Sequence, residues 1–194
     1  MADSHAGTGM IEFARMPGKV AVIRIVGRCS FQNSAYLEKA VEICEREAPN
    51  RCYVLDLERC ESMDSTFLGV LAGLALRQRR RQCGNLIAVN VSGQIRRAMS
   101  LLGLTHVMEL RESHPAVGEG EALTVTESSK LDMQRADQVA HMIEAHQKLI
   151  EVDSGNEVRF ENVIKYLGDS LYRARAGEET ESDAKPSPFG EKSS

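Results

Sequence analysis

The segment 54–71 constrains the fold of this chain more than any other. It starts inside a continuous apolar run, 52–57, passes through a short polar loop, and enters a helix-forming stretch over about 65–82. A run without polar alternation is typical of a strand buried on both faces. A second such run, 85–91, follows the helix, and parallel strands need a crossover connection of this kind. This order of elements predicts an α/β fold.

Other segments of the first 111 residues complete the same architecture. Two β-rich runs, 10–14 and 19–26, are joined by Pro17-Gly18 and predict an N-terminal hairpin. Apolar residues at helical spacing predict a helix over 33–47, with Asn33 or Ser34 as its N-cap.

A third helix and a last strand follow the second apolar run. Ser92 is placed to cap a helix that runs to about residue 102 and ends at Gly103, and 106–110 has the pattern of a short strand. The resulting order, ββαβαβαβ, predicts a mixed β-sheet with crossover helices.

Three residues with capping side chains, Asp64-Ser65-Thr66, precede the apolar part of the second helix. Any of them could serve as the N-cap. Ser65 and Thr66 would also lie beside unpaired backbone N–H groups and the positive end of the helix dipole, where a phosphate on a hydroxyl can be held. Such a place suits a phosphorylation switch better than a catalytic pocket.

One motif directly after a strand carries a family resemblance: Asp64-Ser65-Thr66-x-Leu68-Gly69-Val70-Leu71. It resembles the STAS domains, whose best-studied members are bacterial anti-sigma factor antagonists, and the resemblance runs from about residue 10 to residue 110. The resemblance implies phosphorylation of the motif's second hydroxyl residue by an anti-sigma factor that acts as a serine/threonine kinase. That residue is Thr66, with Ser65 as the runner-up. The family usually has Gly where this chain has Phe67, a departure that concerns the partner more than the fold.

The resemblance further implies a protein-interaction switch that regulates transcription in bacteria. The unphosphorylated protein would bind the anti-sigma factor and so release a sigma factor, and phosphate on Thr66 would expel the partner. The second helix carries a second apolar stripe that burial on one side does not require, so it should be covered by the C-terminal helices or offered to a partner. The expected partner-binding residues are Asp64, Ser65, Phe67, Val70 and Leu74.

Two other functions stay open. The chain could be a STAS-type accessory subunit of a membrane transport or signalling complex, in which the same helix packs constitutively and Thr66 is a cap. It could also be an enzyme that uses Asp64 as a base with Ser65 or Thr66 as nucleophile, although no histidine lies near in sequence to complete a relay. We expect no enzyme, because no nucleophile elbow, Gly-rich phosphate loop or other catalytic motif is present.

Composition and side-chain spacing argue against several other classes. The net charge is −4 and no Lys/Arg cluster is interleaved with aromatic residues, so nucleic-acid binding is not expected. Arg77, Arg79, Arg80 and Arg81 are interpreted as solvated cations that complement a helix C-terminus rather than as an anion site. His141 and His146 are five residues apart, which suits solvated or packing histidines better than metal ligands. We expect no metal and no cofactor.

The cysteines and the N-terminus indicate a cytoplasmic location. Five cysteines without a Cys-x-x-Cys pair argue against a disulfide framework or zinc ribbon, so we interpret them as reduced; they are Cys29, Cys44, Cys52, Cys60 and Cys83. The N-terminus lacks the basic and apolar regions of a signal peptide. No run approaches the ~18 apolar residues that would span a bilayer, so direct membrane insertion is not expected.

The remaining segments are predicted to lie outside the STAS-like domain of residues 10–111. Residues 1–9 are expected to be flexible, 112–128 to be a linker, and 176–194 to be a disordered tail. Two amphipathic helices, over about 129–151 and 156–174, should form a helical hairpin within 129–175, with a capping box at Ser154-Gly155-Asn156-Glu157 between them.

The hairpin needs somewhere to bury its apolar side chains. Its second helix carries a stripe formed by Phe160, Val163, Ile164, Leu167 and Leu171. An isolated pair of helices could hardly bury both of its stripes, so the hairpin must dock on the sheet domain, on a second copy of the chain or on a partner. We expect a homodimer, because the sheet domain already resembles a complete unit. The alternative is docking in cis over Phe67, Val70 and Leu74, which would autoinhibit the partner surface.

Overall fold

The computed structural model describes residues 9–15, 19–48, 51–117, 125–126 and 133–176. Residues 1–8 of the predicted flexible N-terminus, the Pro17-Gly18 turn, most of the predicted linker and the tail from residue 177 lie outside the described residues.

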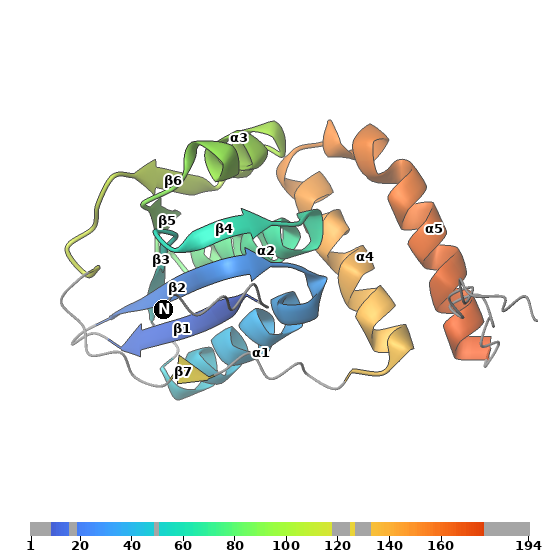
Figure 1. Ribbon diagram of the computed structural model, residues 1–194, viewed down its shortest axis with the longest axis horizontal. Coiled ribbons are helices and arrows are strands. Elements are labelled where there is room, and N and C mark those ends of the chain that lie inside the picture. Colours follow the sequence, from blue (N-terminus) through green and yellow to red (C-terminus); the bar gives the residue numbers. More distant parts are fainter. Residues whose placement is uncertain (1–8, 16–18, 49–50, 118–124, 127–132, 177–194) are drawn as a thin grey trace, which may run out of the picture.

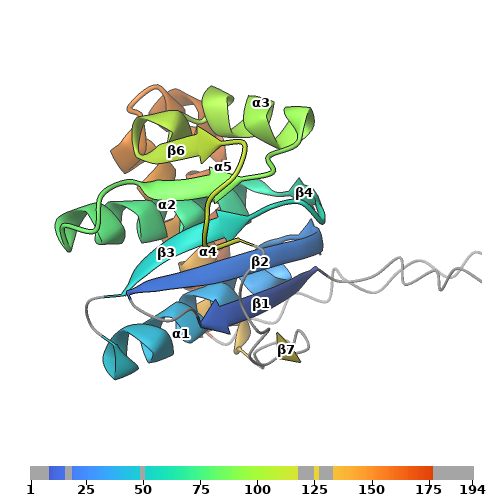
Figure 2. The same cartoon turned by 90° about the vertical axis from the view of Figure 1, so that its left-hand side faces the viewer.

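A mixed β-sheet forms the centre of the molecule (Figures 1 and 2). Its strands are β1 (Met10–Arg15), β2 (Val20–Cys29), β3 (Cys52–Asp56), β4 (Cys60–Met63), β5 (Leu86–Val89), β6 (Met108–Arg111) and β7 (Val125–Thr126). The strand order is β6-β5-β3-β2-β1-β7, and β4 pairs separately with β2. β1 and β2 are antiparallel, whereas β2, β3, β5 and β6 are mutually parallel. The predicted mixed sheet with crossover helices is therefore confirmed.

The described residues form five α-helices. They are α1 (Phe31–Glu47), α2 (Ser65–Arg80), α3 (Gly93–Leu101), α4 (Arg135–Val152) and α5 (Asn156–Ala176), and a 3-10 turn (Leu104–His106) follows α3. α1 and α2 pack beside each other against the sheet, and α3 lies near β6 at its edge (Figure 2). α4 packs across α2, and α5 packs on the outer side of α4 (Figure 1). The predicted helical hairpin is thus present and is docked on the sheet domain.

The hydrophobic core lies between the sheet and the helices on it. Alternate residues of β2 point toward α1 and α2, as expected for a period of two along a strand. Both faces of the central strands are buried, in keeping with their continuous apolar sequences. The buried residues include Ile23, Ile25, Leu55, Leu37, Val41, Phe67, Leu71 and Leu74, with Val22, Val54 and Val89 on the other face.

Two short strands were not anticipated. β4 lies where a polar loop was expected, and β7 lies within the expected linker. β4 has only four residues, two of them polar, so no periodicity marks it. Its pairing with β2 depends on Gly27, whose φ of 72° lies in the left-handed region and where the register between the two strands shifts.

The predicted start of α1 is wrong by two residues. Ser30 is its N-cap and forms a capping box with Asn33, whose side chain accepts from the Ser30 N–H at 2.9 Å. Asn33 therefore supports the cap from inside the helix, and Ser34 is fully buried. The caps predicted for α3 are confirmed: Ser92 accepts from Ile95, and Gly103 ends the helix at a φ of 74°.

The turn between α4 and α5 is organised by side chains other than the expected capping box. The Asp153 carboxylate accepts from the backbone N–H of Gly155 at 2.9 Å. The Asn156 side chain is buried and donates to the carbonyl of Leu149 in α4 at 2.8 Å and to that of Leu102, just after α3, at 3.0 Å. This amide ties the hairpin to the sheet domain.

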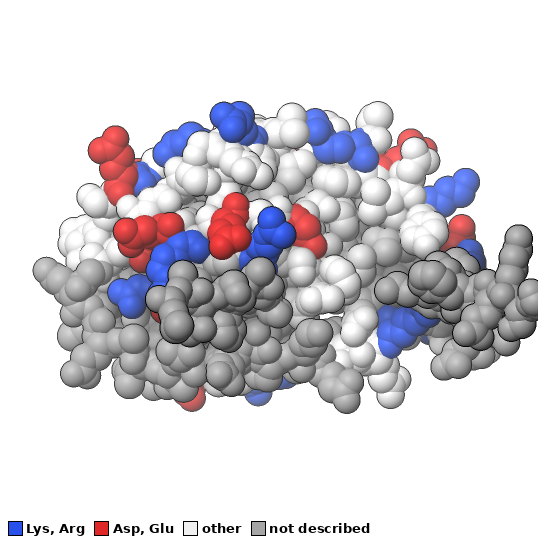
Figure 3. Space-filling model, in the orientation of Figure 1, with Lys and Arg blue, Asp and Glu red and all other residues white. Residues whose placement is uncertain are grey.

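Charged side chains of both signs are interspersed on the face of the molecule shown in Figure 3. The described part of this face therefore carries no extended field of one sign.

Candidate functional site

Asp64 joins the N-termini of two helices. It follows β4 directly and is the N-cap of α2, where its Oδ1 accepts from the backbone N–H of Phe67 at 2.8 Å. Its Oδ2 accepts from the backbone N–H of Phe31, in the first turn of α1, at 2.8 Å. Both carboxylate oxygens are thus engaged by amides at the positive ends of helices, which is a favourable place for negative charge. Asp64 performs the capping, so neither neighbouring hydroxyl is needed for it.

Ser65 contacts the C-terminal hairpin. Its Oγ lies 3.0 Å from Nε2 of His146, a residue of α4 that is 3% exposed. The other ring nitrogen, Nδ1, lies 2.7 Å from the carbonyl oxygen of Met142, so Nδ1 carries the donated hydrogen. In the neutral ring, Nε2 is then the acceptor for the Ser65 hydroxyl. The edge of the same ring packs on Phe160 of α5, with centroids 4.7 Å apart. One histidine thereby links α2, α4 and α5.

Thr66, the predicted phosphoacceptor, is only 3% exposed. In a helix, residues three, four and seven positions further on share its side, here Gly69, Val70 and Gly73. α4 crosses this side at Gly69 so closely that a Cβ built there would lie 2.2 Å from the carbonyl oxygen of Ala145. The structure therefore places Thr66 on the side of α2 that α4 covers, and not on an open surface.

The predicted partner stripe of Phe67, Val70 and Leu74 is also buried, but for a different reason. Phe67 and Leu74 are 0% and 1% exposed and share a face with Gln78. The Gln78 side chain bonds the backbone of Tyr53 in β3, accepting at 2.7 Å, so this face is turned to the sheet. The expectation that Phe67 and Leu74 lie on a surface covered by the hairpin or a partner is wrong, because the sheet covers them.

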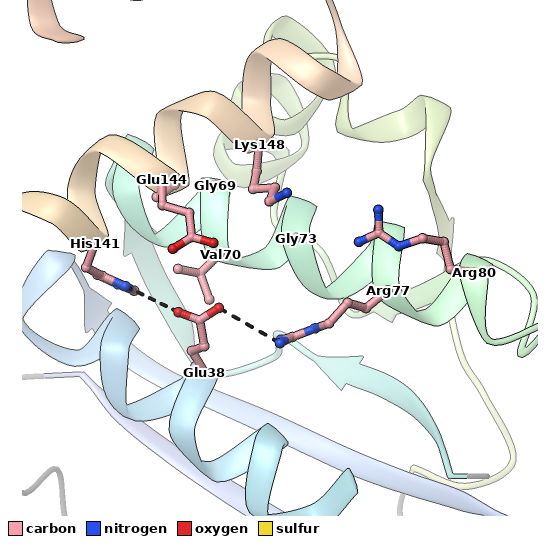
Figure 4. Close-up of a pocket in the computed structure, with 10 residues that line it drawn as sticks. Glu38, Gly69, Val70, Gly73, Arg77, Arg80, His141, Glu144 and Lys148 are labelled. Atoms are coloured by element: carbon pink, nitrogen blue, oxygen red, sulfur yellow. Dashed lines mark ion pairs between the residues drawn. The ribbon is translucent and has the colours of Figure 1, made fainter. Parts of the chain in front are cut away.

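Val70 occupies a different position. It lines a small cleft of about 150 Å³ where α1, α2 and α4 meet (Figure 4). The polar side chains around the cleft include Glu38 of α1, Arg77 of α2 and His141 of α4. Glu38 lies 3.3 Å from Nδ1 of His141 and 3.9 Å from Nη1 of Arg77 (Figure 4). Val70 therefore faces the contact between the hairpin and the sheet domain.

Ionic and hydrogen-bonding contacts join α1 and α4 along this cleft. Nε2 of His141 lies 2.8 Å from Oγ of Ser34 in α1. The hydrogen bond from His141 lowers the pKa of Glu38, and the charges of Arg77 and Lys148 add to this effect. The carboxylate of Glu38 is thereby stabilised at the point where α4 meets α1.

Both histidines of α4 therefore bond a serine of the sheet domain. This fits the sequence interpretation of His146 as a packing histidine, but its partner Ser65 was missed. The sequence did indicate that His146 needs a polar partner, because it lies on the apolar stripe of its helix and a buried polar ring must be hydrogen-bonded. Among the residues that the structure describes, no cluster of three or more His, Cys, Asp or Glu side chains could hold a metal ion.

Three of the four arginines at the end of α2, Arg77, Arg80 and Arg81, pair with acids on neighbouring helices, whereas Arg79 donates to the carbonyl of His106. Arg77 reaches Glu38 of α1, and Arg80 lies 3.6 Å from Glu151 of α4. They therefore add to the helix contacts, beyond the predicted role of complementing the dipole. None of the five cysteines, all of which the structure describes, takes part in a disulfide bond.

The apolar stripe of α5 is partly buried within the chain. Phe160 and Leu167 are 7% and 5% exposed, Ile164 and Leu171 are half-buried, and Val163 is 39% exposed. α5 packs on α4, so part of the burial that motivated a homodimer is met within the chain. The homodimer through the C-terminal helices stays a prediction.

The sequence matches a known family over more than half of its length. A model of the STAS domain family matches residues 14–120, which is 107 of 194 residues. The chain belongs to the STAS domain family.

Three solved structures are similar to about half of this chain at low identity. The unphosphorylated form of the anti-sigma factor antagonist SpoIIAA is 16% identical, with a TM-score of 0.45, over 54% of this chain and 89% of SpoIIAA. The phosphorylated form of SpoIIAA from Bacillus is 20% identical, with a TM-score of 0.43, over 52% and 90%. A Thermotoga maritima protein provisionally described as an anti-sigma factor antagonist is 19% identical, with a TM-score of 0.47, over 53% and 86%.

None of the helices that the structure describes is both long and apolar enough to cross a membrane.

Proposed function

We propose that this protein is a phosphorylation-regulated interaction switch of the anti-sigma factor antagonist type. The observation that carries the proposal is the Asp64-Ser65-Thr66 motif at the N-terminus of α2 in a STAS domain. The unphosphorylated form binds an anti-sigma factor with serine/threonine kinase activity in the bacterial cytoplasm, and so regulates transcription. Phosphorylation of Thr66 ends that binding.

The position of Asp64 supports an electrostatic mechanism for the switch. A phosphate on Thr66 would add a charge of about −1.5 to −2 two residues away from the Asp64 carboxylate. The helix itself tolerates this charge, because its N-terminus is the positive end of the dipole. A partner that packs on the same turn would have to desolvate two neighbouring negative groups, so the phosphorylated form would be expelled.

The acceptor is tested with the cognate kinase, ATP and mass spectrometric mapping of the phosphate. We expect label on wild-type protein and on Ser65→Ala, and none on Thr66→Ala. Ser65 is the natural competitor, since it is less buried than Thr66 and its hydroxyl already bonds His146. Label kept by Thr66→Ala and lost by Ser65→Ala would reject the assignment.

The switch itself is tested by comparing Thr66→Glu with Thr66→Val. The glutamate should weaken binding of the partner that recognises the unphosphorylated protein. The valine, which keeps the β-branched shape, should leave this binding intact. Equal affinities for the two variants would reject the switch.

A second candidate is a STAS-type accessory subunit of a membrane transport or signalling complex. The coverage of Thr66 by α4 favours such a constitutive role. In that case proteins captured by Thr66→Glu and Thr66→Val would be the same and would include transport components.

We also propose that the chain is not an enzyme. Both oxygens of Asp64 accept from backbone N–H groups, which supports a capping role over that of a general base. His146 does supply a ring nitrogen to Ser65, but the pair lies in the contact between α2 and α4, where a substrate has no room.

A further inference from the structure

α4 is fitted to α2 by a crossing of small residues. Gly69 faces Ala145, and no side chain larger than hydrogen could stand at position 69 with α4 in place. One turn later, Gly73 faces the aliphatic stem of Lys148, 3.5 Å from the position of a built Cβ. Small residues at a crossing let two helix backbones approach closely. This side of α2 is therefore shaped to receive a helix.

Polar contacts anchor α4 on both sides of this crossing. His146 bonds Ser65 in the first turn of α2, and His141 bonds Ser34 in the first turn of α1. Ser34 is also the donor to the Phe31 carbonyl, at 3.1 Å, and Phe31 in turn bonds Asp64. The anchors thus converge on the two helix N-termini that Asp64 joins. α4 ends up on top of the motif that carries the proposed switch.

α5 reinforces the docked position of α4. Phe160 covers the outer edge of the His146 ring, and Asn156 connects the start of α5 to the end of α3. The whole hairpin is therefore held as one unit against the sheet domain. Its release would expose Ser65, Thr66 and the glycine side of α2 together.

We infer that the side of α2 bearing Ser65, Thr66 and Gly69 is a helix-docking surface, and that α4 occupies it as an internal competitor of the protein partner. The partner fits the same surface with an amphipathic helix of its own that carries a small residue at the crossing, as α4 does with Ala145. The chain then has a closed form, with the hairpin docked, and an open form that can bind the partner and receive phosphate. The role of α4 as a competitor of a protein partner rests on the proposed function, whereas the docking surface rests on the helix contacts alone.

Variants in α4 test this without altering α2. Ala145→Trp places a large ring against the backbone of Gly69 and should release the hairpin. Gln147→Trp makes the same change two residues away at an exposed position and is the matched control. His146→Ala removes the bond to Ser65 and the packing on Phe160 without adding bulk, so it serves if Ala145→Trp fails to fold.

The first readout is amide hydrogen exchange in the full-length protein. We expect exchange in the first turns of α2, and throughout α4, to rise roughly tenfold or more in Ala145→Trp and to a smaller extent in His146→Ala. Exchange in Gln147→Trp should match wild type. Equal exchange in Ala145→Trp, His146→Ala and Gln147→Trp would overturn the inference.

The second readout uses a synthetic peptide of residues 133–153 as the occupant. When this peptide is added in excess to the Ala145→Trp protein, it should restore protection of the α2 amides. A peptide that itself carries the Ala145→Trp substitution should not restore it. Failure of the unchanged peptide to protect α2 would show that this side of α2 does not receive a helix.

The third readout is the rate of phosphorylation by the kinase of the proposed function. It should rise in Ala145→Trp and stay at the wild-type value in Gln147→Trp. Faster exchange and peptide protection without any phosphorylation, in all variants, would reject the proposed function and leave the docking surface standing. Phosphorylation at equal rates in the closed and open variants would reject α4 as a competitor.

Discussion

Replacing each of two glycines on one side of α2 by alanine should have opposite consequences. Gly69 and Gly73 lie one turn apart, and both face α4. A Cβ at position 69 would lie 2.2 Å from the carbonyl oxygen of Ala145, whereas one at position 73 would lie 3.5 Å from Cγ of Lys148. The first atom belongs to a helix backbone and cannot turn away. The second belongs to a flexible side chain at ordinary contact distance.

The magnitudes follow from two opposing effects. Alanine in place of glycine stabilises a helix interior by about 0.5–1 kcal/mol. At position 73 nothing opposes this gain, so Gly73→Ala should raise the free energy of unfolding by about that amount. At position 69 the contact falls 1.2 Å short of ordinary van der Waals distance (3.4 − 2.2 Å). Overpacking of this kind costs about 1–3 kcal/mol, which exceeds the helix gain.

Urea unfolding and hydrogen exchange of each variant provide the measurement. Gly69→Ala should destabilise the docked hairpin, so the amides of α4 and α5 exchange faster while those of the central strands change little. Gly73→Ala should show the wild-type pattern with a slightly higher unfolding midpoint. If both variants are stabilised alike and α4 stays protected, then α4 does not pack on Gly69 as described and the inferred docking surface is lost.

Two further predictions concern side chains around the same motif. Asp64→Ala removes an N-cap, worth about 1 kcal/mol, and a charge-assisted hydrogen bond from Phe31, worth about 1.5–3 kcal/mol. Asp64→Asn should destabilise the protein less, because the amide oxygen can keep one of these two acceptor roles. Urea unfolding that ranks the two variants the other way would contradict this account. Glu38→Gln should lower stability at pH 7, because a carboxylate whose pKa is lowered on folding, here chiefly by His141, stabilises the folded state above its unfolded pKa. That contribution shrinks as the pH falls below the unfolded pKa of about 4.3 and is lost once the pH has fallen through the lower folded pKa, so the stability curves of wild type and Glu38→Gln should converge over this range. A difference that stays constant throughout it would refute the ion pair's role.

Local sequence determined the elements and several of their ends. The apolar runs 52–57 and 85–91, with a helix between them, specify parallel buried strands because only such strands hide apolar side chains on both faces. Ser92 and Gly103 mark the two ends of α3, since capping and left-handed backbone geometry depend on the residue itself. The position of Asp64-Ser65-Thr66 before an apolar helix likewise predicted a capping motif at the N-terminus of α2.

The tertiary structure alone decided what covers each face. β4 exists only because β2 offers its backbone beside Gly27, and four residues of mixed polarity do not encode that pairing. Two faces of α2, the one with Phe67 and Leu74 and the one with Thr66, consist mostly of apolar or small residues, so the sequence does not distinguish them. Which of them meets the sheet and which meets α4 depends on long-range packing. The contact between Gly69 and Ala145 joins segments far apart in the chain, and no local periodicity records such a meeting. The amphipathic pattern of the hairpin required that its stripes be buried, but only packing in three dimensions decided that α4 lies at the Asp64-Ser65-Thr66 motif.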